Sequence, residues 1–466
     1  MTNRFPRQKG ERHALDEAKA PAYIEGMPLS RTFYSLYSLY SFAGVIAVLA
    51  AWDTPAPAAR APLEPATAFV DVTVVPMDRE RLLPHQTVVV VGERIADLGP
   101  VGDVKPPPGA RIIDGRHRYL VPGLADMHVH SSSDSLELRL YLANGVTTIR
   151  DLNGSPRLLA WRDAIAAGRM EGPRLLVSGP LIAGPDVPWR NKVVPRSPEE
   201  GRAVVRAQKA AGYDYIKIYD GVPADVYMAV IDEARRQGMM VTGHIPQSVG
   251  LAGVLAAHQN LEHLDKIVFS AWGHAFDPSR IPSIADSIKR AGVWDTPTLL
   301  SMERLALLNR GKGDSLMQLP GVSLASSENR AYWTELNKQM THAMPVNPAY
   351  RFNPFVDFQI LLLRGLVDAG VPLLAGTDTP NAMLVPGYSL LDELDALADA
   401  GLSPYRVLEM ATSNPARFTG GEAAPGIIER GRRADLLLLG ANPLASLHAL
   451  RERVGIMAGG KWQPTG

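Results

Sequence analysis

Two histidines stand two residues apart in VPGLADMHVH, residues 121–130. If this stretch is a strand, His128 and His130 point to the same face, because side chains alternate between the two faces of a strand. Two neutral imidazoles on one face suit a divalent metal ion. The same spacing alone also fits two ordinary surface histidines, so the rest of the chain has to decide between these interpretations.

Four further side chains with metal or acid–base chemistry lie in similar apolar stretches. They are Lys217 in YIKIYD, His244 in VTGHIP, His263 in NLEHLD and Asp378 in LLAGTD. Each alone has an ordinary explanation, such as a hydrogen-bonded core histidine, a solvated lysine or an aspartate that caps a helix. We interpret them as one site because all would lie at the same end of parallel strands, where the reactive side chains of α/β barrels gather.

The spacing of the apolar stretches predicts the fold that positions these residues. From residue 124, short apolar runs alternate with segments of helical pattern, as in parallel strands covered by helices. We expect a (β/α)8 TIM barrel over residues 122–423, with a helical lid formed by an insertion at 300–352. The eight predicted strands are 124–130, 146–152, 174–179, 215–220, 239–245, 260–265, 293–300 and 371–378.

Segments rich in β-forming residues flank this predicted barrel. Residues 67–121 contain runs such as TVVVVGERIADLG, and residues 424–466 return to the same pattern in RADLLLLG and RVGIMAGGKW. Such runs, broken by turn residues, predict short strands. We expect the two segments to form one small β-sandwich beside the α/β barrel.

Residues 1–66 are predicted to be an extension outside the fold. After Arg31, an apolar run that includes residues 42–52 is followed by APAARA and a Pro/Ala-rich linker at 54–66. This order is typical of a secretory signal peptide, and Met27 would give it a conventional short start. We expect a periplasmic or extracellular protein without stable membrane association after cleavage. The alternative is an uncleaved segment that anchors the protein in a membrane.

Composition excludes several classes of protein. The 466 residues include 48 basic and 48 acidic residues and no cysteine. Balanced charge without a basic block gives no indication of nucleic-acid binding. The lack of cysteine excludes disulfides, thiolate metal ligands, a cysteine nucleophile and a lipidated-cysteine anchor. A small-molecule substrate is the expected partner, and the sequence leaves open whether the chain forms a homo-oligomer.

A lysine among metal ligands needs a chemical reason, because two cations repel a protonated amine. Two ions ~3.5–4 Å apart need an anionic bridge, and their bridging water ionises near neutral pH. Lys217 supplies that anion if its neutral amine adds CO₂ to form a carbamate. Asp378 would ligate one ion, take the proton of the water and pass it to the leaving group.

The chain resembles the amidohydrolase superfamily, and within it the imidazolonepropionase-like and prolidase-like metal-dependent hydrolases. The resemblance covers residues 67–466 and implies two divalent ions, with Zn²⁺ expected. It implies that His128, His130 and Asp378 hold one ion, that His244 and His263 hold the other, and that carboxylated Lys217 bridges them. It rests on PGLADMHVH, TTIRDLNG, YIKIYD, GHIP, LEHLD, AGTDTPN, DELDALADAGLSPYRVLEMATSNPARFTG and GIIERGRRADLLLLGANPL.

Four other residues carry less specific signals. Arg150 and Asp151 end TTIRD and would either support the metal ligands or form a structural ion pair. Tyr219 follows Lys217 by two residues, on the same strand face, and would donate a hydrogen bond to a substrate carbonyl or merely pack. Trp189, in the loop after the third strand, would line the substrate pocket or cap the lid.

Because all six ligand positions are filled, we expect a hydrolase that acts on a carbon–nitrogen bond in an amide or peptide-like substrate. Ester or lactone hydrolysis at the same site, and metal binding without turnover, are the alternatives. Many prolidase-like relatives follow the fifth-strand histidine with a polar or aromatic group, as in His-Ala-Tyr. This chain has His244-Ile245-Pro246 instead. The motifs therefore do not predict dipeptidase activity.

Overall fold

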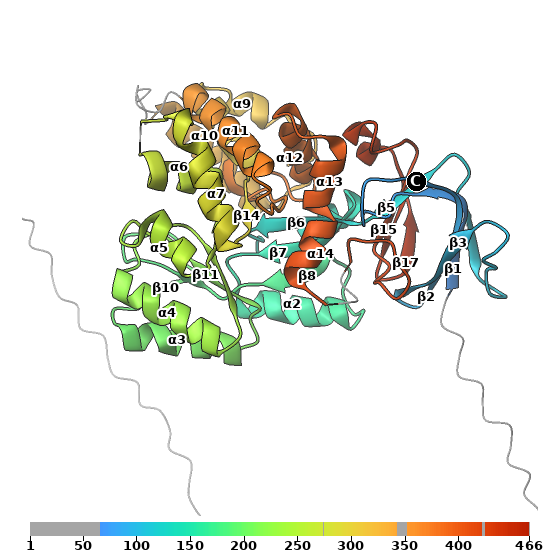
Figure 1. Cartoon of the computed structure of the whole chain (residues 1–466), viewed down its shortest axis with the longest axis horizontal. Coiled ribbons are helices and arrows are strands. Elements are labelled where there is room, and N and C mark those ends of the chain that lie inside the picture. Colours follow the sequence, from blue (N-terminus) through green and yellow to red (C-terminus); the bar gives the residue numbers. More distant parts are fainter. Residues whose placement is uncertain (1–65, 274, 343–351, 422–424, 466) are drawn as a thin grey trace, which may run out of the picture. The chain divides into compact units, whose positions relative to one another are not determined.

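The computed structural model describes residues 66–273, 275–342, 352–421 and 425–465 (Figure 1). The predicted extension at 1–66, with its signal peptide or anchor and its linker, lies outside these residues apart from Ala66. In the part of the chain that is described, no helix combines the length and apolar character needed to cross a membrane.

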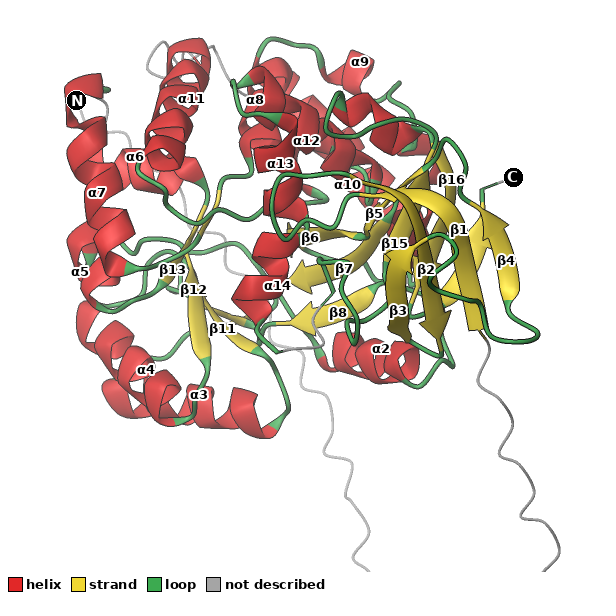
Figure 2. Cartoon of the chain, turned by 45° about the vertical axis from the view of Figure 1, so that its right-hand side comes forward, coloured by secondary structure: helices red, strands yellow, loops and turns green. Residues whose placement is uncertain are grey.

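Segments from the two flanks of the chain share one mixed sheet (Figure 2). Its order is β17-β16-β15-β5-β1-β2-β3, and β4 pairs with β1. The strands are β1 (Ala66–Val74), β2 (Leu83–Val91), β3 (Arg94–Pro100), β4 (Arg111–Asp114), β5 (Tyr119–Pro122), β15 (Leu436–Leu439), β16 (Arg453–Ala458) and β17 (Lys461–Pro464).

The prediction of a β-sandwich is therefore wrong in its layering, although the flanking segments do combine. The antiparallel pair of β5 and β15, with Leu437 opposite Val121, extends one sheet sideways and does not stack a second sheet on it. Alternating side chains serve two cores. Leu436 and Leu438 pack in the core of the mixed sheet, and Leu437 packs in the large core of the α/β body, residues 124–421.

The α/β body contains two parallel sheets. The first has the order β6-β7-β8 and the second β10-β9-β11-β12-β13-β14. Seven of the eight predicted strands are thus present, with two short additional strands after β8. The bounds are β6 (Leu124–Val129), β7 (Val146–Asp151), β8 (Arg174–Val177), β9 (Leu181–Ile182), β10 (Lys192–Val193), β11 (Tyr215–Ile218), β12 (Met240–Gly243), β13 (Asn260–Glu262) and β14 (Asp295–Thr296).

The predicted eighth strand, residues 371–378, does not form, so the strands do not close into one barrel. The segment lies between β14 and β6 but makes only isolated bridges: Leu373 with Asp295, and Thr379, directly after the predicted strand, with Val129. A Cβ on Gly376 would lie 2.8 Å from the backbone nitrogen of His128. Asp378 has a φ of 66°, outside the strand region. The close approach to β6 and this left-handed residue explain why an apolar pattern did not give a regular strand.

Helices surround the parallel strands (Figure 2). Three of them, α2, α3 and α13, begin with a serine whose hydroxyl accepts a backbone N–H, followed by proline at the first helical position. The helices are α1 (Glu137–Ala143), α2 (Pro156–Ala166), α3 (Pro198–Ala210), α4 (Ala224–Arg236), α5 (Gly250–Ala256), α6 (Leu264–Trp272), α7 (Ile281–Ala291), α8 (Leu299–Asn309), α9 (Gly313–Leu316), α10 (Ser327–His342), α11 (Phe352–Asp368), α12 (Tyr388–Asp399), α13 (Pro404–Ala411) and α14 (Ser413–Thr419).

The insertion predicted at 300–352 is helical where it is described, with α8, α9 and α10. The domain boundaries at 121/122 and 423/424 stay predictions, and the second falls on residues outside the described part of the chain.

Candidate metal centre

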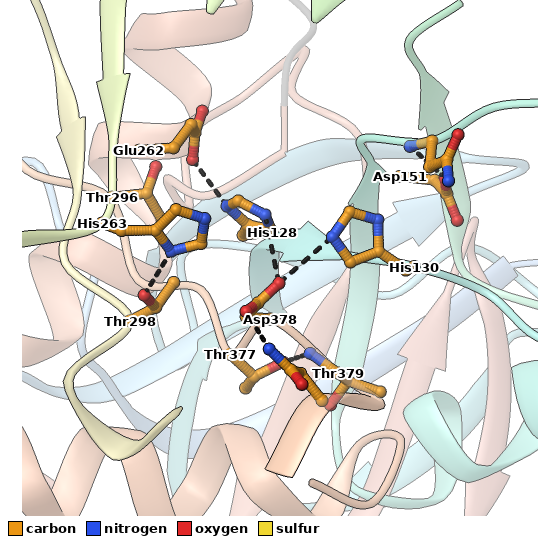
Figure 3. A network of polar contacts seen from close by, with 12 residues as sticks. His128, His130, Asp151, Glu262, His263, Thr296, Thr298, Thr377, Asp378 and Thr379 are labelled. Carbon is orange, nitrogen blue, oxygen red and sulfur yellow. Dashed lines mark hydrogen bonds and ion pairs between the residues drawn. The ribbon is translucent and has the colours of Figure 1, made fainter. Parts of the chain in front are cut away.

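Three buried side chains form the tightest group of potential metal ligands in the described part of the chain. They are His128 at the end of β6, His263 directly after β13, and Asp378. One ligand atom from each lies within 4.8 Å of the others. Figure 3 shows Asp378 between the rings of His128 and His130. Residues far apart in the sequence thus meet at the carboxyl ends of the parallel strands.

Asp378 also contacts the second histidine of the His-x-His pair. Its Oδ1 lies 3.1 Å from Nε2 of His130 and 3.4 Å from Nε2 of His128. Its Oδ2 accepts a hydrogen bond from Asn381 at 3.1 Å. Burial alone raises the pKa of Asp378, but the hydrogen bond from His130 is the largest opposing cause, and the pKa is lowered to about 2.

The segment that carries Asp378 is fixed to β6 by Asp126. The carboxylate of Asp126 accepts hydrogen bonds from the Thr377 backbone at 3.0 Å and the Thr377 hydroxyl at 2.8 Å. The backbone N–H of Asp378 donates to the carbonyl of His128 at 2.8 Å. These contacts replace the ladder of a regular strand and place Asp378 beside the histidines of β6.

His244 and Lys217 extend the group on the other side of His263. The rings of His244 and His263 have centroids 5.1 Å apart. Lys217, on β11, is fully buried, and its Nζ has no hydrogen-bond partner within the described part of the chain. Burial lowers the pKa of Lys217 to about 8. An unpartnered buried amine is costly, so this lysine fits a site that modifies or coordinates it.

Each of three histidines has its Nδ1 held by a neighbour. His128 bonds to Glu262 at 2.8 Å, His244 to Asp220 at 3.1 Å, and His263 to the hydroxyl of Thr298 at 2.7 Å. Such partners orient a ligating ring and leave Nε2 for the metal. Burial lowers the pKa of all three imidazoles well below the usual value, which favours the neutral form that binds metal.

Glu262 is a central residue that the sequence did not single out. It is fully buried and accepts hydrogen bonds from Arg150 at 2.7 Å and from the hydroxyl of Thr242, besides its contact with His128. On a regular strand, Glu262 and His263 would point to opposite faces. The φ of His263 is 75°, so the chain leaves the strand there and both side chains reach the site. The Glu-His pair in LEHLD was the available signal.

Arg150 and Asp151 have separate roles, not those of an ion pair with each other. Arg150 donates to Glu262 and, from Nε, to the carbonyl of Met127 at 2.6 Å. Asp151 accepts the backbone N–H groups of Ser131 at 2.7 Å and Asn153 at 2.9 Å. Arg150 therefore supports His128 through Glu262, and Asp151 fixes the loop that follows His130.

A cavity of about 570 Å³ opens onto this group. Both Tyr219 and Trp189 line it, and Trp189 Nε1 donates to the Tyr219 hydroxyl at 3.0 Å. The Tyr219 ring lies 3.9 Å from that of His244, and the Trp189 ring 5.9 Å from that of His130, between centroids. The two aromatic residues therefore lie against the metal-ligand group.

Comparisons with known proteins agree with this geometry. The amidohydrolase family model matches residues 119–462. The imidazolonepropionase of Rubrobacter xylanophilus is 26% identical over 391 residues, 76% of this chain and 84% of that protein. An adenine deaminase of Paracoccus denitrificans is 22% identical over 77% of this chain and 51% of its own length.

Solved structures give the same result. The bottromycin amidohydrolase is 26% identical with a TM-score of 0.69, and covers 86% of this chain and 87% of that one. A prolidase candidate from Bifidobacterium longum is 28% identical with a TM-score of 0.64, and the match covers 86% of this chain and 96% of that one. The resemblance inferred from the motifs is thus confirmed. The chain belongs to the amidohydrolase family and is a metal-dependent hydrolase that acts on carbon–nitrogen bonds.

Proposed function

We propose that the protein hydrolyses an amide or peptide-like bond at a centre of two divalent ions, with Zn²⁺ as the expected metal. The observation that carries this proposal is the buried group of neutral imidazoles, Asp378 and unpartnered Lys217 at one end of a cavity. His128, His130 and Asp378 would hold one ion, His244 and His263 the other, and a carbamate on Lys217 would bridge them.

The donor set supports a site with a bridge. Nε2 of His128 and Nζ of Lys217 are both buried without a hydrogen-bond partner in the described residues. Imidazole and carboxylate ligands suit Zn²⁺ and similar ions. When bound, such ions polarise a carbonyl and lower the pKa of a water.

Asp378 and Tyr219 are the proposed proton-handling groups. Asp378 is a carboxylate that contacts both histidines of β6, so it would lie beside a metal-bound water and accept its proton. It would return this proton to the leaving nitrogen. Because Tyr219 accepts the hydrogen bond of Trp189, its own O–H remains free to donate to the substrate carbonyl oxygen.

A metal analysis combined with a substrate screen tests the proposal. Protein purified with Zn²⁺ and bicarbonate should contain about two equivalents of metal and hydrolyse amides in a screen of amides, esters and lactones. A preference for esters or lactones would replace the amide assignment, and two ions without any turnover would favour a metal-binding protein. If Lys217→Ala keeps both ions and full activity, the carbamate bridge is wrong.

Export is a separate proposal that rests on the sequence of residues 1–66. Protein isolated from its native host should begin between about Thr54 and Pro65, as N-terminal sequencing would show. Recovery of an intact segment 42–52 in the membrane fraction would instead support an anchor.

A further inference from the structure

Besides the metal ligands, the cavity is lined by an apolar wall. Phe269 of α6, Met302 and Leu305 of α8, and Phe355 of α11 line this wall. Helix α11 contacts both α6 and α8, and Figure 1 shows α6 and α11 on the same side of the α/β body. Three helices thus contribute to the wall: Phe269, Met302 and Phe355 pack with the large core of the α/β body, and Leu305 packs with a neighbouring cluster around Leu308.

Aromatic stacking makes part of this wall rigid. The rings of Phe269 and Phe355 are stacked with centroids 5.0 Å apart. Phe276 lies behind Phe355 at 5.7 Å. Aromatic rings held by neighbours offer a large contact area with little loss of freedom on binding. This wall suits a flat or bulky apolar group of a ligand.

Charge in the cavity disfavours a substrate with a free carboxylate. Of the described residues that line the cavity, Lys266 is the one lysine or arginine. Its Nζ lies 3.3 Å from Oδ2 of Asp265, so its charge is already paired. Glu328 of α10, which also lines the cavity, adds a negative charge and accepts hydrogen bonds from Ser133. Outside the metal ligands, the cavity thus has no spare positive charge for an anionic substrate.

We propose that the substrate is an uncharged amide whose acyl part carries an arene or another large apolar group, and that this group packs against Phe269, Met302, Leu305 and Phe355. The inference rests on the proposed amide hydrolysis and names the substrate class of that site. Since a hydrophobic pocket discriminates by about 10–200-fold for a small change in apolar contact, a whole ring should matter clearly.

Three matched substrates separate the arene from the charge. N-phenylacetyl-glycinamide has both required properties, N-phenylacetyl-glycine adds a carboxylate, and N-acetyl-glycinamide lacks the ring. On Zn²⁺-loaded enzyme, chromatography measures the phenylacetic or acetic acid that is released from each substrate. We expect kcat/KM to be at least about 10-fold higher for N-phenylacetyl-glycinamide than for either other compound. Equal or better use of N-phenylacetyl-glycine or N-acetyl-glycinamide would overturn the inference.

Variants on one helix assign the selectivity to the wall. In Phe355→Ala, the ratio of kcat/KM for N-phenylacetyl-glycinamide over N-acetyl-glycinamide should fall by about 10-fold or more. Leu361→Ala is the matched control, because Leu361 lies on the same helix but is 43% exposed. It should keep the ratio of the parent. An unchanged ratio in Phe355→Ala, with metal content equal to that of the parent, would contradict the assignment.

Binding without turnover distinguishes this inference from the proposed function. Calorimetry with phenylacetamide on the metal-free protein should show binding that weakens in Phe355→Ala and persists in Leu361→Ala. If no amide is hydrolysed but this pattern holds, the proposed function fails and the apolar subsite stands. If amides are hydrolysed and phenylacetamide binds equally to both variants, the subsite is wrong.

Discussion

The cavity has two kinds of lining, called here its metal-ligand end and its apolar end, and they lie on different types of element. At the metal-ligand end, His128, Lys217 and Asp378 come from strands or from the segment beside them, and buried hydrogen bonds fix their surroundings. At the apolar end, the lining comes from α6, α8 and α11, and ring stacking and aliphatic packing hold it. The comparison teaches that chemistry and selectivity are carried by separate elements, so each should change without the other.

The largest effect is expected at the metal-ligand end. Asp378→Asn keeps one ligating oxygen but cannot accept a proton, so kcat should fall by ~10²–10⁴-fold. Metal content should fall only modestly, because His128 and His130 remain. Elemental analysis and kcat on any substrate from the screen check this. Retained metal with kcat within about threefold of the parent would place the proton transfer elsewhere, with Tyr219 as the next candidate.

A substitution of Glu262 tests whether the buried hydrogen bond that orients His128 is needed for metal binding. Glu262→Gln removes the charge that pairs with Arg150 and orients His128, so the affinity for the metal should fall by ~10–100-fold. Competition with a chelator measures this loss. Asp232→Asn on α4 serves as a control for a simple change of charge, because this half-buried carboxylate pairs with Arg235 at 3.8 Å and lies outside the ligand group. Parent-like metal affinity in Glu262→Gln would show that His128 needs no such partner.

Substitutions of Tyr219 and Trp189 test the two aromatic residues that lie against the metal ligands. Tyr219→Phe should lower kcat by about 10-fold if the hydroxyl donates to the reacting carbonyl, within the range of positioned proton donors. Trp189→Phe removes the hydrogen bond to that hydroxyl and part of the ring beside His130, but keeps the hydroxyl itself, so it should have a smaller effect. The comparison is made on kcat with KM measured in parallel. A larger loss in Trp189→Phe than in Tyr219→Phe would show that Trp189 contacts the substrate itself.

The smallest effect concerns the stability of the apolar end. Glu393 accepts the backbone N–H groups of Leu299 and Leu300 at the start of α8, and burial raises its pKa to about 8. A carboxyl with a raised folded-state pKa stabilises fully below its unfolded value of 4.5, and this contribution is lost as the pH rises through about 8. The free energy of unfolding should therefore decrease from pH 6 to pH 9. In Glu393→Gln this decrease should be smaller, as denaturant titrations would show, and an equal decrease would exclude Glu393.

Sequence patterns located the strands and the ligand-bearing motifs because both depend on local chemistry. Apolar runs of the right length predicted eight parallel strands, of which seven are present, and the histidines at their ends follow from that. The irregular path of 371–378 was not predictable, because it depends on the close approach of Gly376 to β6. Glu262 was missed for a similar reason: strand alternation does not anticipate the positive φ of His263.

The layering of the mixed sheet and the apolar wall depend on long-range packing. Both edges of a strand such as β5 look alike in sequence, so the sequence does not say whether β15 extends the sheet or stacks on it. The apolar residues of α6, α8 and α11 read as ordinary core positions until the cavity that they face is known.

The pairing of β5 with β15 also determines the order in which the chain matures. These two strands lie on opposite sides of the whole α/β body in the sequence. The edge of β5 that binds β15 therefore stays unpaired until nearly all of the later residues have been synthesised. Unpaired strand edges can pair with other chains. Although β1 to β5 can pair early, the addition of β15, β16 and β17 is thus a late step, and chains that stop before Leu436 leave one edge of β5 without its partner and prone to aggregate.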